Sequence, residues 1–379
     1  MSALLDRALR ALALVLVLGA PPWAATPAAA QLRWRDLVVT MGGSVEGYSG
    51  NFSAVTAPYV DSAGHVVAVV GEVGVRGAVL LAESRTRSFE LSFDGGARQS
   101  AAFGFRFRDY APREWVGSAS GRVTQSVGSW GTLLVQAGVR GRSVRDRPSM
   151  PLFLQPGYST LQGSVAVLTR SFDGVTFDAQ VDLEQADYQA TQLVPQLNLL
   201  DRKSSAIEAG ARWGGVSTVR FYGGFGWTDY SNQGSFDPED PFRRDHTARV
   251  GLEWTYDGGI SAQVGVDGTV NRSNSNRPEY DAVSARAVLT APLPHEMSLN
   301  LFALLTAKSY VHDTDFDRLV PGEEADNASI AYLQLSRPVA TNLDAAFRLG
   351  WTRAETYYGS FYYRRLGASL QFNYRPVGF

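Results

Sequence analysis

The sequence predicts an all-β protein: a transmembrane, antiparallel, up-and-down β-barrel of sixteen strands, within a range of fourteen to eighteen. Three observations predict this fold. Apolar and polar residues alternate over long stretches, tight turns alternate with longer connections, and most tryptophans fall near the ends of the alternating stretches. Such alternation is the period of a strand that has one face in an apolar medium and the other in water.

Sixteen alternating stretches can be placed along the chain. In order, they lie at 36–50, 66–82, 87–108, 113–127, 131–144, 157–172, 175–189, 204–214, 217–231, 245–257, 260–273, 280–291, 296–311, 327–337, 342–357 and 361–375. The second, fourth and later even-numbered joints are tight turns, such as Asp173-Gly174, and most odd-numbered joints are longer. Asp-Gly between alternating stretches is a strong hairpin signal because both central residues must accept positive φ. Short turns at one rim and longer loops at the other are typical of membrane barrels.

A soluble β-sandwich would show the same alternation, so the period alone does not choose between the two folds. The length of the stretches does, because many reach 14 residues or more, whereas strands in soluble proteins usually have about 5–6. In the stretch 175–189 we expect Val181 and Leu183 to face lipid and Asp182 and Glu184 to face water.

Tryptophan placement supports the barrel. Tryptophan prefers the boundary between membrane and water because an apolar ring carries a polar N–H group. Four tryptophans lie near the short-turn rim and two near the long-loop rim, and a seventh falls inside a stretch: Trp34, Trp130, Trp213 and Trp254; Trp115 and Trp227; and Trp351.

The first 30 residues read as a signal peptide. Arg7 and Arg10 precede a ten-residue apolar stretch at 11–20, and Ala28-Ala29-Ala30 stands directly before Gln31. An anchor helix is the alternative, but ten residues are too few to cross a bilayer, which takes roughly 20. The expected division is therefore a cleaved signal peptide over residues 1–30 and a barrel over residues 31–379.

The last stretch is amphipathic from Leu366 to Tyr374, and the chain ends on Phe379. This ending resembles the assembly signal of bacterial outer-membrane β-barrels, although Pro376 interrupts a ladder and Phe379 lies on the other parity. The resemblance is to porin-like barrels in architecture only. It implies a place in the outer membrane of a Gram-negative cell. It also implies contact with outer-membrane lipid and lipopolysaccharide, and insertion by the barrel-assembly machinery.

Composition and motifs give no sign of an enzyme. The chain has no cysteine, which removes disulfides and thiol chemistry, and its net charge of −2 argues against a nucleic-acid partner. The four histidines (His65, His246, His295 and His312) form no metal-binding spacing, and no cofactor is expected. The acidic stretch from Asp313 to Asp326 could collect Ca²⁺ or bridge cations to lipopolysaccharide phosphates, but a solvated loop is the simpler interpretation.

Inward-facing charges are the candidate functional residues. The predicted pore lining has a basic wall and an acidic wall, made of Arg122, Arg140, Arg142 and Arg170, and of Asp178, Asp182, Glu184 and Glu208. Such separated walls would produce a transverse field, and sixteen strands leave room for an aqueous channel. The alternative is a salt-bridged interior that closes the lumen.

Three functions follow from these alternatives. The first is a passive, porin-like channel for small hydrophilic solutes or ions. The second is a non-conducting structural or surface-binding barrel that acts through its extracellular loops, and an embedded hydrolase is a distant third. The longest predicted connections have 14–15 residues, which puts a long, inward-folded constriction loop in doubt.

Overall fold

The computed structural model describes residues 33–50, 66–103, 111–145, 157–189, 195–235, 238–275, 279–311, 329–355 and 362–376. The strands are β1 (Arg33–Gly50), β2 (Val66–Glu83), β3 (Arg87–Phe103), β4 (Arg113–Val127), β5 (Gly131–Arg145), β6 (Tyr158–Thr169), β7 (Val175–Tyr188), β8 (Arg202–Gly214), β9 (Ser217–Gly234), β10 (Phe242–Asp257), β11 (Ser261–Ser273), β12 (Tyr280–Leu293), β13 (Met297–Tyr310), β14 (Ser329–Ala340), β15 (Leu343–Glu355) and β16 (Tyr362–Tyr374). The predicted signal peptide and Phe379 lie outside the described residues.

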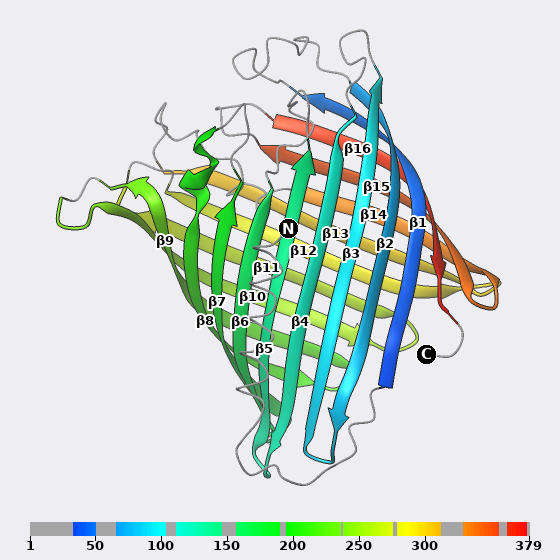
Figure 1. The fold of residues 1–379 in the computed structure, drawn as a ribbon. Helices are drawn as coiled ribbons and strands as arrows, with labels where there is room; N and C mark the ends of the chain where they lie inside the picture. Colours follow the sequence, from blue (N-terminus) through cyan, green and yellow to red (C-terminus); the bar gives the residue numbers. More distant parts are fainter. Residues whose placement is uncertain are drawn as a thin grey trace.

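Every strand pairs with its sequence neighbours in antiparallel fashion, and β1 pairs with β16 to close the sheet into one barrel (Figure 1). The seam runs from Val39 opposite Tyr374 to Gly50 opposite Tyr363. Closure gives every strand a hydrogen-bonded neighbour on each side, which is a condition for a sheet that lies in lipid. The prediction of sixteen antiparallel strands in a closed barrel is confirmed.

Tight turns behave as their sequences predict. Asp173 and Gly174 both have positive φ, and Phe172 and Val175 exchange backbone hydrogen bonds of 2.7 and 2.9 Å across them. Gly214 has a φ of 122°, and a Cβ there would lie 2.0 Å from the Ser217 carbonyl oxygen. Only glycine fits that turn.

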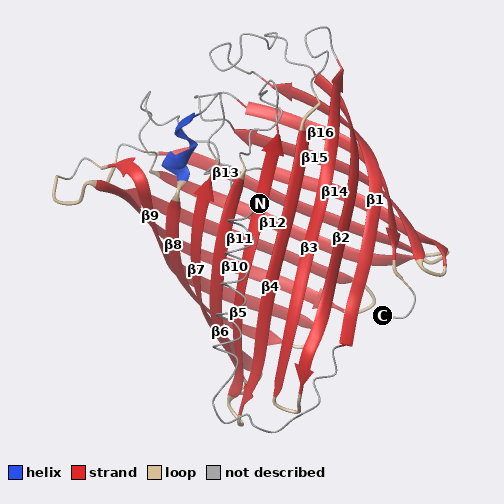
Figure 2. Ribbon diagram, in the orientation of Figure 1, coloured by secondary structure: helices blue, strands red, loops and turns tan. Residues whose placement is uncertain are grey.

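Some predicted boundaries were wrong. The strand predicted at 157–172 ends at Thr169, whereas β9 continues past 231 to Gly234 and β10 begins before 245, at Phe242. A 3₁₀ helix, η1 (Pro195–Leu200), lies in the connection between β7 and β8, where the sequence predicted a loop (Figure 2). In the part of the chain that the structure describes, no helix is long and apolar enough to cross a membrane.

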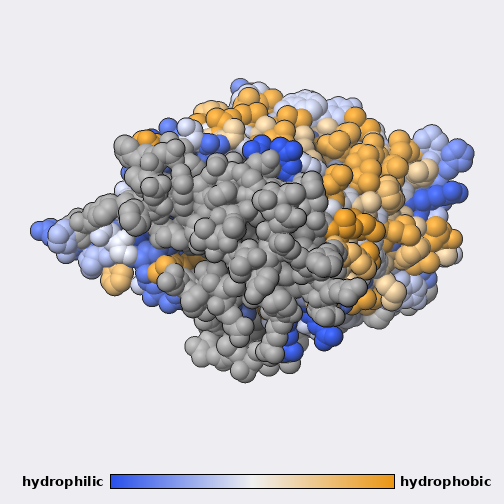
Figure 3. Space-filling view, turned by 90° about the horizontal axis from the view of Figure 1, so that it is seen from above, coloured by the Kyte–Doolittle hydropathy of each residue, from blue (hydrophilic) through white to orange (hydrophobic). Residues whose placement is uncertain are grey.

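The two faces of the wall differ in chemistry. Outward positions carry exposed apolar side chains, including Val181 and Leu183 on β7, whereas Asp182 and Glu184 lie on the other face of that strand. Figure 3 shows hydrophobic residues gathered over part of the outer surface when the barrel is seen from above. Inside a membrane such a surface contacts lipid tails.

Tryptophans lie near both rims. Trp115, Trp213 and Trp254 are exposed and close to strand ends. At the short-turn rim, Trp254 Nε1 donates a 2.9 Å hydrogen bond to Ser217 Oγ. Trp227 lies deeper within its strand than predicted because β9 continues to Gly234.

Candidate functional site in the barrel lumen

Two groups of inward-facing charged residues, each held together by ion pairs, lie on opposite parts of the wall. The first group, here called the β1–β5 cluster, contains one residue from each of the first five strands: Glu46, Glu72, Arg98, Glu114 and Arg142. Glu114 is close to the start of β4 and Arg142 is close to the end of β5, so this cluster lies toward the long-loop rim.

Arg98 is the centre of the β1–β5 cluster. Its Nη2 lies 2.6 Å from Glu46 Oε1, and its Nε and Nη1 lie 3.7 Å from carboxylate oxygens of Glu72 and Glu114. Arg142 Nε donates to Glu114 Oε1 at 2.7 Å. The Arg142 and Glu114 side chains are only 8% and 9% exposed. Three carboxylates and two guanidinium groups are therefore held in a tight contact network.

One glycine connects this cluster to the barrel seam. Gly42 on β1 is paired with Gln371 on one side and with Glu72 on the other. Gln371 Nε2 donates a hydrogen bond to Glu72 Oε1, passing over β1. A Cβ on Gly42 would lie 2.9 Å from Gln371 Cγ and 2.7 Å from the Leu370 carbonyl oxygen. The absence of a side chain at Gly42 thus lets β16 be bridged to β2 across β1.

The second group, here called the β7–β12 ladder, lies nearer the short-turn rim. It consists of alternating acids and arginines with one tyrosine: Asp178, Glu208, Arg212, Arg220, Tyr222, Arg249, Glu253, Asp267 and Arg286. Arg220 contacts Asp178 and Glu208, the latter at 2.8 Å. Arg249 lies 2.7 Å from Asp267, and Arg286 lies 2.9 Å from Glu253.

Tyr222 is the aromatic centre of the ladder. The guanidinium carbons of Arg220 and Arg249 lie 4.7 and 5.5 Å from its ring centroid, within the range of a cation–π contact. The ring lies over Gly251 on β10, where a Cβ would come within 2.3 Å of Tyr222 Cζ. Glycine opposite tyrosine therefore lets the aromatic ring lie flat against the wall between two arginines.

Exposure differs most between three arginines of the ladder and the Arg142–Glu114 pair of the cluster. The side chains of Arg212, Arg249 and Arg286 in the ladder remain 45%, 45% and 42% exposed although they point inward. Their charges are accessible to water and to small ions, whereas those of Arg142 and Glu114 are enclosed by protein.

The four predicted basic residues lie in four different environments. Arg122 and Arg140 are exposed, and Arg140 lies 5.9 Å from the Tyr158 ring centroid. Arg142 is buried in the β1–β5 cluster. Arg170 lies beyond the end of β6, and its Nη2 donates to the Gly128 carbonyl oxygen at 3.2 Å in the neighbouring turn.

The four predicted acidic residues lie along β7 and β8. Asp178 and Glu208 belong to the ladder, where both contact Arg220. Asp182 accepts a 2.7 Å hydrogen bond from Gln180, and Glu184 accepts one of 2.8 Å from Gln162. The expectation of separated basic and acidic walls does not describe this arrangement, because each group holds both signs of charge side by side.

The sequence interpretation left out most members of both groups. Glu46, Glu72, Arg98 and Glu114 of the cluster were not among the predicted pore-lining residues, nor were the ladder's arginines and Tyr222. The sequence did hold a signal for these residues. Each residue lies on the polar parity of its strand, and the turns set which residue of the next strand lies opposite it.

The long-loop rim carries a third polar group beneath η1. Arg243 is 2% exposed, donates to Asp245 Oδ1 at 2.9 Å and to Gln233 Oε1 at 3.0 Å, and lies 4.2 Å from the Tyr230 ring centroid. Gln233 in turn donates to the Leu199 carbonyl oxygen of η1 at 2.6 Å. These contacts fix the β7–β8 connection to β9 at the rim.

Neither metal nor histidine chemistry is indicated by the described part of the chain. No group of three or more metal-ligating side chains occurs among the residues described. His246 is exposed on the outer face and His295 lies in the β12–β13 turn. His65, His312 and the acidic stretch 313–326 lie outside the described residues.

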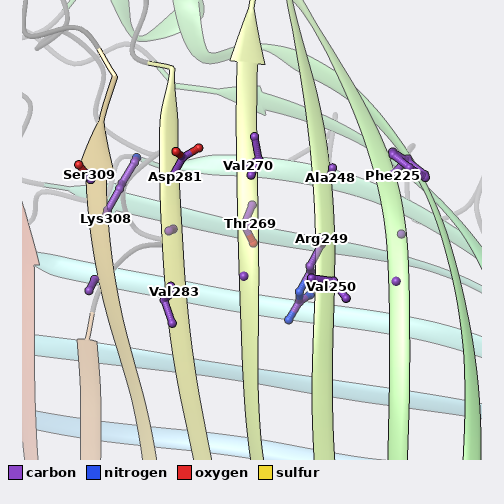
Figure 4. A pocket seen from close by; sticks show the side chains of 15 residues that line it. Phe225, Ala248, Arg249, Val250, Thr269, Val270, Asp281, Val283, Lys308 and Ser309 are labelled. Atoms are coloured by element: carbon purple, nitrogen blue, oxygen red, sulfur yellow. The ribbon is translucent and has the colours of Figure 1, made fainter.

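A hollow of about 850 Å³ lies over β9 to β13 (Figure 4). Its side walls are the outward-facing Phe225, Val250, Val270 and Val283, and small residues such as Gly268 form its floor. Because this apolar hollow opens on the outer face, lipid tails fill it in a membrane. Arg249 and Lys308, which lie on the inward parity of their strands, also belong to its lining.

Comparison with known proteins shows no family for this chain. Neither a protein-family model nor a curated protein matches the sequence. Among solved structures, it overlaps OccD3 (OpdP) of Pseudomonas aeruginosa at 10% identity and a TM-score of 0.42, over 95% of this chain and 98% of that one.

Two further overlaps are weaker. A mutant of the Rhodopseudomonas blastica porin matches at 9% identity and a TM-score of 0.32, over 90% of this chain and 100% of that one. The toluene transporter TodX of P. putida matches at 9% and 0.36, over 91% of each chain. At such values no property of these proteins is carried over to this one.

The strand register and the surface of this chain are sufficient to assign its class of fold and its location. A closed antiparallel sheet of sixteen strands, with an apolar outer face and a charged inner face, is a transmembrane barrel of the bacterial outer membrane.

Proposed function

We propose that this barrel is a passive channel for small hydrophilic solutes and ions. The observation that carries the proposal is the exposure of Arg212, Arg249 and Arg286, which face inward yet keep more than two fifths of their side-chain surface accessible. In small barrels side chains fill the interior, whereas barrels of 16–18 strands leave an aqueous channel. No catalytic step is part of the proposal.

The β7–β12 ladder would act on solutes through its field. Wall charges surrounded by a low-dielectric medium concentrate counter-ions in a water-filled passage. The ladder balances four arginines (Arg212, Arg220, Arg249 and Arg286) against four carboxylates (Asp178, Glu208, Glu253 and Asp267). We therefore expect weak ion selectivity, together with orientation of dipolar solutes along the alternating charges.

Conductance across a planar lipid bilayer tests the proposal. The purified barrel should give stepwise single-channel currents in KCl. The variant R249Q/R286Q leaves Asp267 and Glu253 without their arginine partners and should shift the reversal potential in a KCl gradient toward cation preference. The shift should shrink as salt rises, because the screening length falls from roughly 10 Å at 0.1 M to roughly 3 Å at 1 M.

Arg337→Gln is the matched control. Arg337 is an exposed arginine on the outer face of β14, so its removal should leave the reversal potential unchanged. A folded barrel that carries no current would overturn the channel and favour the structural, surface-binding alternative. A current with an unmoved reversal potential would show that the ladder does not line the conduction path.

A further inference from the structure

Two arginines face each other across β4 and β5 on the outside of the barrel. Arg113 is the first residue of β4, Arg145 is the last residue of β5, and the two are directly paired in register. They share the outward parity of Trp115. Glu114, which lies between Arg113 and Trp115 in the sequence, points into the lumen toward Arg142. Like charges directly opposite one another destabilise a sheet.

The paired outward neighbours of these arginines bring no negative charge. Those positions are Gln99, Trp115 and Ser143, and Arg113 Nε donates to Gln99 Oε1 at 2.6 Å. Two outward arginines elsewhere on the barrel are paired with carboxylates. Arg244 lies 3.1 Å from Asp229, and Arg272 lies 2.9 Å from Asp281. The Arg113–Arg145 pair thus presents two exposed guanidinium groups to the same point outside the wall.

The position of the pair points to the headgroups of the outer leaflet. Both residues lie at the long-loop ends of their strands, next to the exposed Trp115. Toward the middle of the strands, Gly95, Gly117 and Gly141 are paired in one outward-facing row. A Cβ at Gly95 or Gly117 would come no closer than 3.7 or 3.9 Å to another atom, so crowding does not require glycine there.

We propose that Arg113 and Arg145 together bind a phosphate group of lipopolysaccharide in the outer leaflet. Guanidinium groups hold phosphate through paired, charge-assisted hydrogen bonds, and basic clusters at a membrane boundary select phosphorylated headgroups. Trp115 would contact the sugar at the boundary, and acyl chains would lie along the flat glycine row. The site is on the outer face and does not depend on whether the lumen conducts.

Lipopolysaccharide titration of the detergent-solubilised barrel, followed by native mass spectrometry, tests the site. Relative to the unmodified protein, R113Q/R145Q should lose affinity by roughly 30-fold, about fivefold for each arginine. Dephosphorylated lipopolysaccharide should bind both proteins equally weakly. R113K/R145K should retain part of the affinity, because lysine keeps the charge without the bidentate geometry.

Arg337→Gln is again the control, since that arginine faces outward at the short-turn end of β14. It should bind lipopolysaccharide as the unmodified protein does. The proposal is overturned if R113Q/R145Q keeps full affinity, if R337Q loses as much, or if inorganic phosphate competes so well that the lipid part contributes nothing.

Folding and conduction are measured on the same variants. Circular dichroism and resistance to unfolding in cold detergent report the barrel, and R145Q alone replaces the double variant if the latter does not fold. R145Q alone should bind lipopolysaccharide with an affinity about fivefold lower than that of the unmodified protein. Unchanged single-channel currents in R113Q/R145Q with lost lipid binding would separate this site from the proposed channel function.

Discussion

The β1–β5 cluster and the β7–β12 ladder use the same residue types in the same barrel, yet individual ion pairs in them differ in burial. Arg142 and Glu114 in the cluster are 8% and 9% exposed, whereas Arg249 in the ladder is 45% exposed beside Asp267. Enclosed charges must keep their partners because water cannot replace them. Accessible charges can exchange a partner for water or a passing ion. Burial therefore decides which inward charges support the wall and which are available to solutes.

The largest expected effect is a loss of stability in the cluster, measured against the matched loss of one carboxylate in the ladder. Glu114→Gln leaves Arg142 enclosed without its 2.7 Å partner and should lower the free energy of unfolding by about 3 kcal/mol or more. Asp267→Asn, the matched change in the ladder, should cost about 1 kcal/mol at most, because Arg249 remains in water. Urea unfolding in lipid vesicles measures both. Equal losses would mean that exposure does not distinguish the two groups.

A smaller loss of stability is expected when arginine is placed on the lipid face of β7, and a still smaller one when it is placed on the lumen face. Val181→Arg or Leu183→Arg should cost ~2–4 kcal/mol near the membrane midplane, whereas Asp182→Arg and Glu184→Arg should be tolerated. The same unfolding assay applies. A cost at Asp182 and Glu184 in place of Val181 and Leu183 would place the register of β7 one residue out, and equal tolerance at all four positions would contradict a lipid-facing Val181 and Leu183.

Glycine substitutions compare how much room each group has. Gly42→Ala places a Cβ 2.7 Å from a backbone oxygen beside the cluster and should cost roughly 1–3 kcal/mol. At Gly251 in the ladder the nearest atoms to an added Cβ belong to the Tyr222 side chain and not to the backbone, so Gly251→Ala should cost less if that side chain can move. Gly71→Ala, with no atom within 4 Å, is the control and should be neutral. A larger loss at Gly251 than at Gly42 would show that Tyr222 is fixed.

The smallest expected effect concerns the predicted basic residues. Arg122→Glu with Arg140→Glu should shift the reversal potential toward cations by a modest amount, because both side chains are exposed. Arg170→Glu should shift it less, since that residue lies at a turn beyond β6. Planar-bilayer recordings in a KCl gradient give both values. A larger shift from Arg170 would place the charge-sensing region at the short-turn rim.

The fold was predictable because its signals are local. Alternation within a stretch and turn pairs such as Asp173-Gly174 lie within a few residues of one another, so the strands and closed barrel could be placed from the sequence. The end of β6 was missed because Arg170 continues the polar parity although its backbone N–H bonds to Trp130 in the neighbouring turn. Parity alone does not show where pairing stops.

Partners within the lumen were much less predictable. Arg98 on β3 reaches Glu46 on β1, and Arg220 on β9 reaches Asp178 on β7, so each contact skips a strand. Such contacts depend on cross-strand register and on which intervening residue is small. Arg142 is buried and Arg140 is exposed, although the two residues lie on the same parity of one strand. Their difference in burial depends on three-dimensional contacts that the sequence pattern does not show.

The bridge from Gln371 over Gly42 to Glu72 has a consequence for the order of events in barrel formation. Its ends are separated by 299 residues, so it can form only after the last strand has docked against the first. A contact made after the rate-limiting step slows opening while leaving the rate of folding nearly unchanged. We therefore expect Gln371→Ala to shorten the lifetime of the closed barrel. Unfolding of that variant should begin with separation of β1 from β16.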